Sequence, residues 1–258
     1  MSLLEMKHIK KEFGGMPVIR DISLSVEQGE ILAIIGPSGS GKSTLLRCAT
    51  MLETIDDGEI LYLGKRAAWV ENGKPAFPKK QEMKEIQSCF GLVFQNFNLF
   101  PHFSVIKNIT DAPIRVQKRE KEEVYEEAKK LLTKMGLADK ADAYPYQLSG
   151  GQRQRTAAAR AIITRPALVL ADEPTGALDS KSARLLLDRF EELNGAQRTT
   201  ILMVTHDAFT ASCCHRVIFL RDGQIFLELS RGGMDRRAFF AQIIRVVSQL
   251  GGEMEDVL

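Results

Sequence analysis

The sequence is poor in the features that define several common protein classes. Among 258 residues only four are cysteine, and Cys48, Cys89, Cys213 and Cys214 show none of the spacings that bind zinc or form a redox pair. No segment approaches the roughly 18 apolar residues of a membrane-spanning helix. The N-terminal residues also lack the apolar stretch of a signal peptide. We therefore expect a soluble chain with reduced thiols, which would need a separate subunit for any work inside a membrane.

Net charge is also low, because 35 basic residues are set against 33 acidic ones. A balanced charge gives no general electrostatic reason to bind nucleic acid, and we expect no such partner. Apolar residues make up 44% of the chain and charged residues 26%, as in an ordinary soluble protein. The length suits one large domain or two smaller lobes with a substantial core.

One glycine-rich segment dominates what the sequence does contain. It follows the apolar run 31–35 and leads into residues that can continue as a helix. Glycines let backbone N–H groups converge on an anion, and a helix N-terminus adds partial positive charge. Within the segment, Lys42 is placed to reach the β- and γ-phosphates of a nucleotide, and the Ser43 hydroxyl is placed to ligate Mg²⁺. We predict that a nucleoside triphosphate binds at Gly36, Pro37, Ser38, Gly39, Ser40, Gly41, Lys42, Ser43 and Thr44.

A second motif is the acidic pair Asp172-Glu173, which ends the apolar run 167–171. The Asp172 carboxylate can hold Mg²⁺ beside a triphosphate. Glu173 can accept a hydrogen bond from a water molecule and activate it as a general base. Acidic residues at strand ends are common in α/β proteins and alone do not indicate a function. The presence of the phosphate loop makes a catalytic role for this pair the favoured interpretation, because the two motifs would act on the same nucleotide.

A third motif, residues 148–155, is a second glycine-rich turn that opens a predicted helix. Its backbone N–H groups, a hydroxyl and the positive potential of the helix end could together bind an anion. Taken alone, the motif favours the reading of an ordinary helix N-cap with a tight turn. The residues of interest are Ser149, Gly150, Gly151 and Gln152.

Strand and helix patterns alternate along the chain, which predicts an α/β nucleotide-binding core with an inserted helical lobe. Two or three strands are expected within residues 3–30, and the pattern turns helical from about 96 to 163. Residues 64–82 are polar and contain Pro75 and Pro78, so we expect a surface excursion there. A helix is expected at 239–250, where it would pack on the core.

The second glycine-rich turn lies between the phosphate loop and the acidic pair, and in this chain order the three motifs resemble those of ATP-binding cassette (ABC) proteins. The resemblance covers roughly residues 3–230. It implies an α/β fold: a P-loop NTPase (RecA-like) core with an antiparallel β-subdomain and an inserted α-helical subdomain. It further implies a nucleotide-binding core at 1–95 and 159–232, a helical signature subdomain at 96–158, and a C-terminal tail at 233–258.

The resemblance also implies roles for residues that looked ordinary alone. Phe13, otherwise a core aromatic, matches the residue that stacks on adenine, and Val18 lies near the base. Gln95 matches the Q-loop glutamine, which senses Mg²⁺ and the attacking water and meets the transmembrane subunit. His206 matches the switch histidine that contacts the γ-phosphate. Asp179, in the D-loop (177–179), lies close to the nucleotide.

A head-to-tail homodimer in the ATP state follows from the resemblance. Each ATP would be held by Lys42, Ser43 and Asp172 of one copy and by Ser149 and Gly151 of the other. A single phosphate-loop face leaves the γ-phosphate half exposed, whereas a second helix end excludes water and completes the charge clamp. ATP would join the copies, and its hydrolysis would release them.

Three stretches, 90–102, 108–113 and 144–147, resemble the ATPase subunits of bacterial polar amino-acid importers. This implies an ATP hydrolase that powers import from the cytoplasmic face of the membrane, where it is peripheral. Its partners would be transmembrane permease subunits and an extracytoplasmic solute-binding protein. Apolar side chains after the Q-loop could line the groove for the permease, although core packing within the helical lobe is the alternative.

Departures from the importer pattern keep other tasks open. The Thr175-Gly176 pair is closer to lipoprotein-release and macrolide-export relatives, and Ala171 and Ser180 also differ from the importers. An exporter or lipoprotein-release subunit is therefore an alternative. A soluble cassette protein in DNA repair or translation is a further one, although the chain has a single cassette and no sustained heptads.

Overall fold

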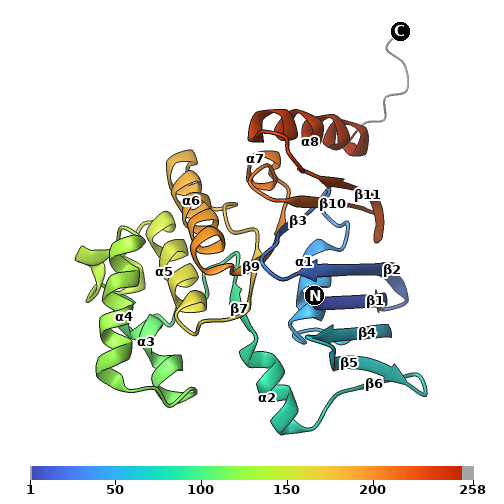
Figure 1. Cartoon of the computed structure of the whole chain (residues 1–258). Helices are drawn as coiled ribbons and strands as arrows, with labels where there is room; N and C mark the ends of the chain where they lie inside the picture. Colours follow the sequence, from blue (N-terminus) through green and yellow to red (C-terminus); the bar gives the residue numbers. More distant parts are fainter. Residues whose placement is uncertain (1, 252–258) are drawn as a thin grey trace.

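Two β-sheets organise the fold of this chain, whose computed structural model describes residues 2–251 (Figure 1). The first is antiparallel, with strand order β2-β1-β4-β5-β6. The second has the order β11-β10-β3-β9-β8-β7 and is parallel except for β11 at its edge. The bounds of the first sheet are β1 Ser2–Phe13, β2 Met16–Glu27, β4 Asp57–Tyr62, β5 Lys65–Glu71 and β6 Lys74–Ala76. Those of the second are β3 Ile31–Ile35, β7 Phe90–Val93, β8 Leu168–Asp172, β9 Thr200–Thr205, β10 Arg216–Arg221 and β11 Gln224–Ser230.

The parallel sheet is buried on both faces, as its apolar runs predict. In β3, Leu32 and Ile34 face the antiparallel sheet, whereas Ala33 and Ile35 face the helices. A single strand, β9, lies between β3 and β8. The carboxyl ends of parallel strands lie on the same side of a sheet. This order therefore brings the phosphate loop, which follows β3, close to the acidic pair at the end of β8.

The helices divide between the two faces of the parallel sheet. Helix α1 and the antiparallel sheet share one hydrophobic cluster, and α3 to α8 contribute to the cluster on the opposite face (Figure 1). The bounds of the α-helices are α1 Lys42–Ala49, α2 Lys80–Ser88, α3 Val105–Arg115, α4 Lys121–Lys134, α5 Gly150–Ile162, α6 Ser180–Gln197, α7 Ala208–Ala211 and α8 Arg236–Gly251. Within the described part of the chain, short 3₁₀ helices span Ala138–Lys140 and Pro145–Gln147.

The expected surface excursion at 64–82 is mostly exposed, but it is regular structure rather than a loop. These residues form β5 and β6, which complete the antiparallel sheet, and the start of α2. The strands are short, and only Ala67 and Ala68 of β5 are buried. Small buried residues and polar neighbours give a weak alternation, which explains why the composition resembles that of a loop.

The helical lobe agrees with its sequence pattern, in which helix is expected from about 96 to 163. Helix α5 continues to Ile162. A Cβ at Gly91 in β7 would lie 2.4 Å from the Ala161 carbonyl oxygen, so α5 packs directly against the parallel sheet. Helix α8 packs on the core through Phe239 and Ile243, as expected for the tail. Residues 252–258 of the expected tail lie outside the described residues.

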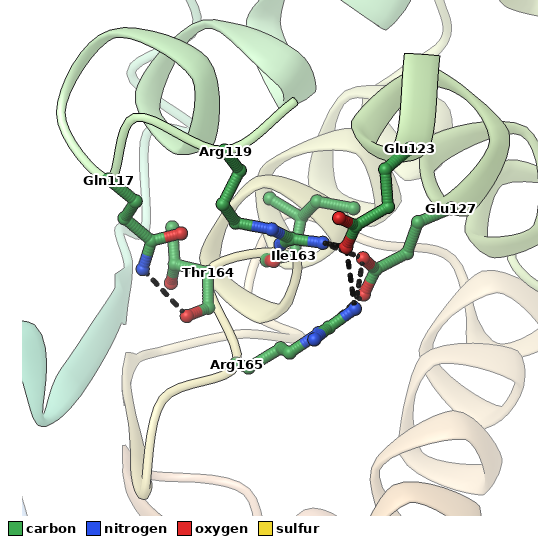
Figure 2. Close-up of polar contacts among 7 residues, drawn as sticks. All are labelled: Gln117, Arg119, Glu123, Glu127, Ile163, Thr164 and Arg165. Atoms are coloured by element: carbon green, nitrogen blue, oxygen red, sulfur yellow. Dashed lines mark hydrogen bonds and ion pairs between the residues drawn. The ribbon is translucent and has the colours of Figure 1, made fainter. Parts of the chain in front are cut away.

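The C-terminal end of α5 is held by a cluster of polar contacts, which we call the α5 clamp (Figure 2). Arg119 donates to the Ile163 carbonyl at 3.1 Å and also pairs with Glu127. Arg165 donates to the same Glu127 carboxylate at 2.7 Å. Burial opposes the ionisation of Glu127, but hydrogen bonds from Arg165 and Arg119 hold its pKa below the ordinary value. The clamp consists of Gln117, Arg119, Glu123, Glu127, Ile163, Thr164 and Arg165.

Candidate active site

Backbone geometry makes the phosphate loop a cradle that only glycine can form. A Cβ at Gly36 would lie 2.3 Å from the Leu220 carbonyl oxygen, and one at Gly41 would lie 2.8 Å from that of Val18. Gly41 has a φ of 95° and precedes α1, which no side chain of residues 2–251 caps. The first N–H groups of α1 are therefore directed at the cradle and can bind an anion. Within the same described residues, the Ser40 hydroxyl is buried without a hydrogen-bond partner.

Lys42 lies across this cradle with its side chain buried. Its Nζ donates to the carbonyl oxygens of Gly36 at 2.8 Å and Pro37 at 2.9 Å. Burial lowers the pKa of Lys42, and the nearby Glu173 and Asp172 carboxylates oppose that shift. The arrangement holds a cation beside the N–H groups that would meet the phosphates.

The structure brings Ser43 and Asp172 together, as the sequence predicts for a Mg²⁺ site. The Ser43 hydroxyl donates to Asp172 Oδ1 at 2.9 Å. Burial raises the pKa of Asp172, and the hydrogen bond from Ser43 opposes that rise. A hydroxyl and a carboxylate oxygen are hard ligands of the kind that Mg²⁺ takes alongside phosphate oxygens and water. The pair therefore fits a magnesium nucleotide.

Glu173 and His206 also meet, because β8 and β9 are neighbouring strands. His206 Nδ1 lies 2.9 Å from Glu173 Oε2, without the alignment of a hydrogen bond. Glu173 is 8% exposed and has a φ of 48°, a strained conformation for this residue type. Its N–H donates to the Val204 carbonyl at 2.9 Å, which holds the turn in place. A buried carboxylate held beside an exposed imidazole can accept a proton from water.

The remaining phosphate-side residues lie around this centre. Gln95 follows β7, where Val93 pairs with Ala171 of β8, so its exposed side chain lies at the same sheet edge as Asp172. Phe13 ends β1 and is 46% exposed. Val18, in β2, presents its carbonyl to the phosphate loop, as the close approach to Gly41 shows.

Ser149 and Gln152 form a capping box at the start of α5. The Gln152 N–H donates to Ser149 Oγ at 3.3 Å, and the Ser149 N–H donates to Gln152 Oε1 at 2.9 Å. A Cβ at Gly151 would lie 2.5 Å from Ser182 Oγ, so this turn packs tightly against α6 of its own chain. Gly150 lies beside the Ala177 carbonyl, 3.4 Å from where its Cβ would be.

Asp179 has a local structural task in this chain, since its carboxylate caps α6. It accepts from the Ser182 N–H at 2.9 Å and from the Ser182 hydroxyl at 2.8 Å. These hydrogen bonds, that of the N–H foremost, lower the pKa of Asp179. The D-loop is thus fixed between the start of α6 and the glycine turn of α5.

Sequence reasoning missed Lys11, whose ammonium lies 5.0 Å from the centroid of the Phe13 ring. The signal was available, because alternate residues of a strand share a face and Lys11 precedes Phe13 by two. It also missed the α5 clamp, in which the partners Gln117 and Thr164 are 47 residues apart in the sequence. No local pattern marks such pairs.

Comparisons with known proteins give a consistent result. The family model described as "ABC transporter" matches residues 19–176. The chain is 39% identical over 260 residues to the bacitracin export ATP-binding protein BceA of Halalkalibacterium halodurans, covering 99% of this chain and 100% of that protein. It is 40% identical over 227 residues to the glutamine transport ATP-binding protein GlnQ of Bacillus subtilis, covering 88% and 90%.

A solved structure is similar as well: the ATP-binding cassette MJ0796, a dimer in a post-hydrolysis state bound to ADP and Pi. The TM-score is 0.78 at 32% identity, over 90% of this chain and 100% of the other. The expected P-loop NTPase fold, with its antiparallel sheet and helical subdomain, is confirmed. Within residues 2–251 no helix is long and apolar enough to cross a bilayer. The chain belongs to the ABC transporter family, as an ATP-binding and ATP-hydrolysing subunit.

Proposed function

We propose that two copies of this chain bind ATP head to tail, with each nucleotide between the phosphate loop of one copy and the start of α5 of the other. The observation that carries the proposal is the placement of the two helix starts. Buried residues of α1 and α5 belong to clusters on opposite faces of the parallel sheet. A second copy can supply the start of α5 to the exposed side of the cradle. The dimeric state of the MJ0796 cassette supports this arrangement.

In this site, Lys42 and the N–H groups of α1 bind the phosphates, while Phe13 stacks on adenine beside Val18. Ser43 and Asp172 hold Mg²⁺, with Gln95 at the same edge, and the ion when bound neutralises charge on the phosphate oxygens. Ser149 of the second copy directs its hydroxyl at the γ-phosphate, and the capping box holds it there. The remaining phosphate-side contacts come from Gly36, Pro37, Ser38, Gly39, Ser40, Gly41 and Thr44, and those of the second copy from Gly150, Gly151, Gln152 and Asp179.

Glu173 accepts the proton of the attacking water. Its carboxylate is buried, so the surrounding protein atoms fix its orientation. His206 lies 2.9 Å away and can orient the same water or contact the γ-phosphate. Burial keeps competing water out, which strengthens each electrostatic contact with the transferring group.

Replacement of Glu173 tests this assignment. Glu173→Gln keeps the shape but removes the base, so we expect turnover to fall by roughly 10²- to 10⁴-fold with ATP affinity retained. A nucleotide-bound dimer should then accumulate, measured by light scattering with Mg-ATP. The matched control is Glu122→Gln, which changes an exposed glutamate at the start of α4. Normal hydrolysis by Glu173→Gln would remove Glu173 from its role.

The work of the cycle is transport through a separate membrane permease, with this chain peripheral on the cytoplasmic face. A hollow of about 290 Å³ beside the site fits this task. It is lined by Leu46, Leu52, Leu92 and Phe94 together with Asp172, so a permease segment seated there would lie next to the Mg²⁺ ligands. Movement of that segment and the state of the nucleotide would then influence each other.

For the direction of transport we propose export first, because similarity to BceA runs through α8 and covers 99% of this chain. The match to GlnQ covers 88%. The Thr175-Gly176 pair points the same way. Import of polar amino acids, with an extracytoplasmic solute-binding protein, is the second candidate. It is favoured by the 40% identity to GlnQ and by the stretch 90–102.

One reconstitution separates the two candidates. The chain is purified with its permease, placed in liposomes, and its ATPase rate is measured with bacitracin or with single amino acids and a binding protein. Stimulation by the peptide alone supports export. Stimulation that requires an amino acid and a binding protein supports import. The Glu173→Gln complex serves as the background control.

A further inference from the structure

Lys11 is an almost fully buried lysine whose ammonium is surrounded by oxygen atoms. It is 7% exposed, and Nζ lies 3.1 Å from Glu53 Oε1, 3.3 Å from Asp56 Oδ1 and 3.3 Å from Thr54 Oγ1. Burial works against the charge, but hydrogen bonds to Glu53 and Asp56 outweigh it and raise the pKa of Lys11. The side chain is therefore a fixed cation held between two segments of the chain.

The same ammonium lies over the ring of Phe13, 5.0 Å from its centroid. A cation at this distance is attracted by the negative face of the ring and restricts its orientation. Lys11 occupies one face of a side chain that is 46% exposed. The exposed part of the ring is available to a flat partner such as a nucleobase.

The oxygen ligands of Lys11 belong to the turn that follows α1, the helix of the phosphate loop. The N–H groups of Leu52 and Glu53 donate to the Arg47 carbonyl at 2.9 and 3.1 Å. Asp56 accepts from the Glu12 N–H at 2.7 Å through Oδ2. The end of α1 and the end of β1 therefore form one hydrogen-bonded unit, with the Lys11 ammonium at its centre.

We propose that Lys11 is a positioning residue that fixes the Phe13 ring relative to α1, so that base and triphosphate are bound in one geometry. The proposal rests on the role of Phe13 as the adenine platform. A purely structural lysine would change stability alone. A positioning lysine changes the part of the affinity that depends on the base.

The test compares two probes on the full-length chain: Mg-ATP and magnesium tripolyphosphate, which lacks the base. Lys11→Met should weaken ATP binding by about threefold to tenfold and leave tripolyphosphate binding within twofold. Lys11→Arg, which keeps a cation able to lie over the ring, should retain most of the ATP affinity. The matched control is Lys10→Met, because Lys10 is an exposed neighbour paired with Asp57 at 2.7 Å.

Two results would overturn the proposal: wild-type ATP affinity in Lys11→Met, or equal loss of ATP and tripolyphosphate binding. Phe13→Ala separates this from a failure of the proposed function. If that variant binds ATP normally, the adenine platform itself is wrong. If it loses ATP affinity and Lys11→Met does not, the platform stands and Lys11 has no positioning role. Should Lys11→Met fail to fold, Asp56→Asn gives the same reading, since it loosens the hold on Lys11 and should produce the same base-dependent loss.

Discussion

The chain contains two glycine-rich turns that open helices, and they solve the same local problem in opposite ways. Helix α1 begins after Gly41 without a side-chain cap from the described residues, so its first N–H groups are available to a ligand. Helix α5 begins with a capping box in which Ser149 and Gln152 satisfy each other. Helix starts leave four N–H groups without partners, and a cap uses up part of that supply.

The difference indicates a division of labour between the two half-sites. The start of α1 combines open donors with the buried cation of Lys42, which suits it to hold most of the charge of a triphosphate. The start of α5 offers a hydroxyl whose position is already fixed. The α1 half-site thus provides most of the affinity for ATP, and the α5 half-site completes the site when the two copies come together.

The largest effect on ATP affinity is expected at Lys42. Lys42→Met removes the cation from the α1 half-site and should weaken ATP binding by roughly 10- to 100-fold, as loss of a charged hydrogen-bond donor does. Isothermal titration of the full-length chain with Mg-ATP measures this. Lys74→Met, which changes an exposed lysine of β6, is the control. Unchanged affinity in Lys42→Met would place the main phosphate contacts elsewhere.

At the α5 half-site we expect an effect on turnover rather than on first binding. Ser149→Ala should lower the ATPase rate by roughly tenfold and leave binding to a single copy within twofold. Loss of the cap also costs about 1 kcal/mol of stability. Ser104→Ala matches that cost, because Ser104 caps α3 by accepting from the Lys107 N–H at 3.4 Å. If both variants slow turnover equally, the effect is one of stability.

The two aspartates of the half-sites should respond to pH with opposite signs. Burial raises the pKa of Asp172 above 3.8, so its ionisation opposes folding and this cost appears as pH rises through the folded-state pKa. Hydrogen bonds from Ser182 lower the pKa of Asp179 below 3.8, so its ionisation favours folding and this gain is lost as pH falls through the folded-state pKa.

We therefore expect Asp172→Asn to raise the Tm at pH 7 and Asp179→Ala to lower it. Both differences from wild type should shrink as pH is lowered toward 3 and the wild-type carboxylates become protonated. Differential scanning fluorimetry between pH 3 and 8 measures this. Equal signs at pH 7 would contradict the contrast between the half-sites.

The smallest functional effect is expected at the far end of α5. Arg119→Met removes the hydrogen bond to Ile163 and leaves Glu127 with one partner fewer, which should cost about 2 kcal/mol of stability. ATP affinity should stay unchanged, because the α1 half-site is untouched. Lys129→Met, which breaks the exposed pair with Glu126, should leave the stability almost unchanged. Urea denaturation measures both.

Most of the fold and the phosphate-side residues of the site could be predicted from sequence motifs. The buried strands and the glycine turns can be recognised from their composition. The phosphate loop and the acidic pair meet because the carboxyl ends of β3 and β8 lie on the same side of the sheet. The strands β5 and β6 were missed because few of their side chains are buried. Contacts such as Lys11 with Glu53, and Arg119 with Ile163, join residues distant in sequence. Only the folded chain defines them.

The left-handed backbone at Glu173 has a consequence for how this chain can change. Glycine or asparagine would adopt a φ of 48° with less strain, so the fold alone would favour replacing the glutamate. Retaining the glutamate lowers the thermal stability of the protein but keeps the side chain proposed for ATP hydrolysis. A laboratory selection for heat resistance that ignores ATP consumption should therefore discard this side chain early, and recover a more robust but idle protein.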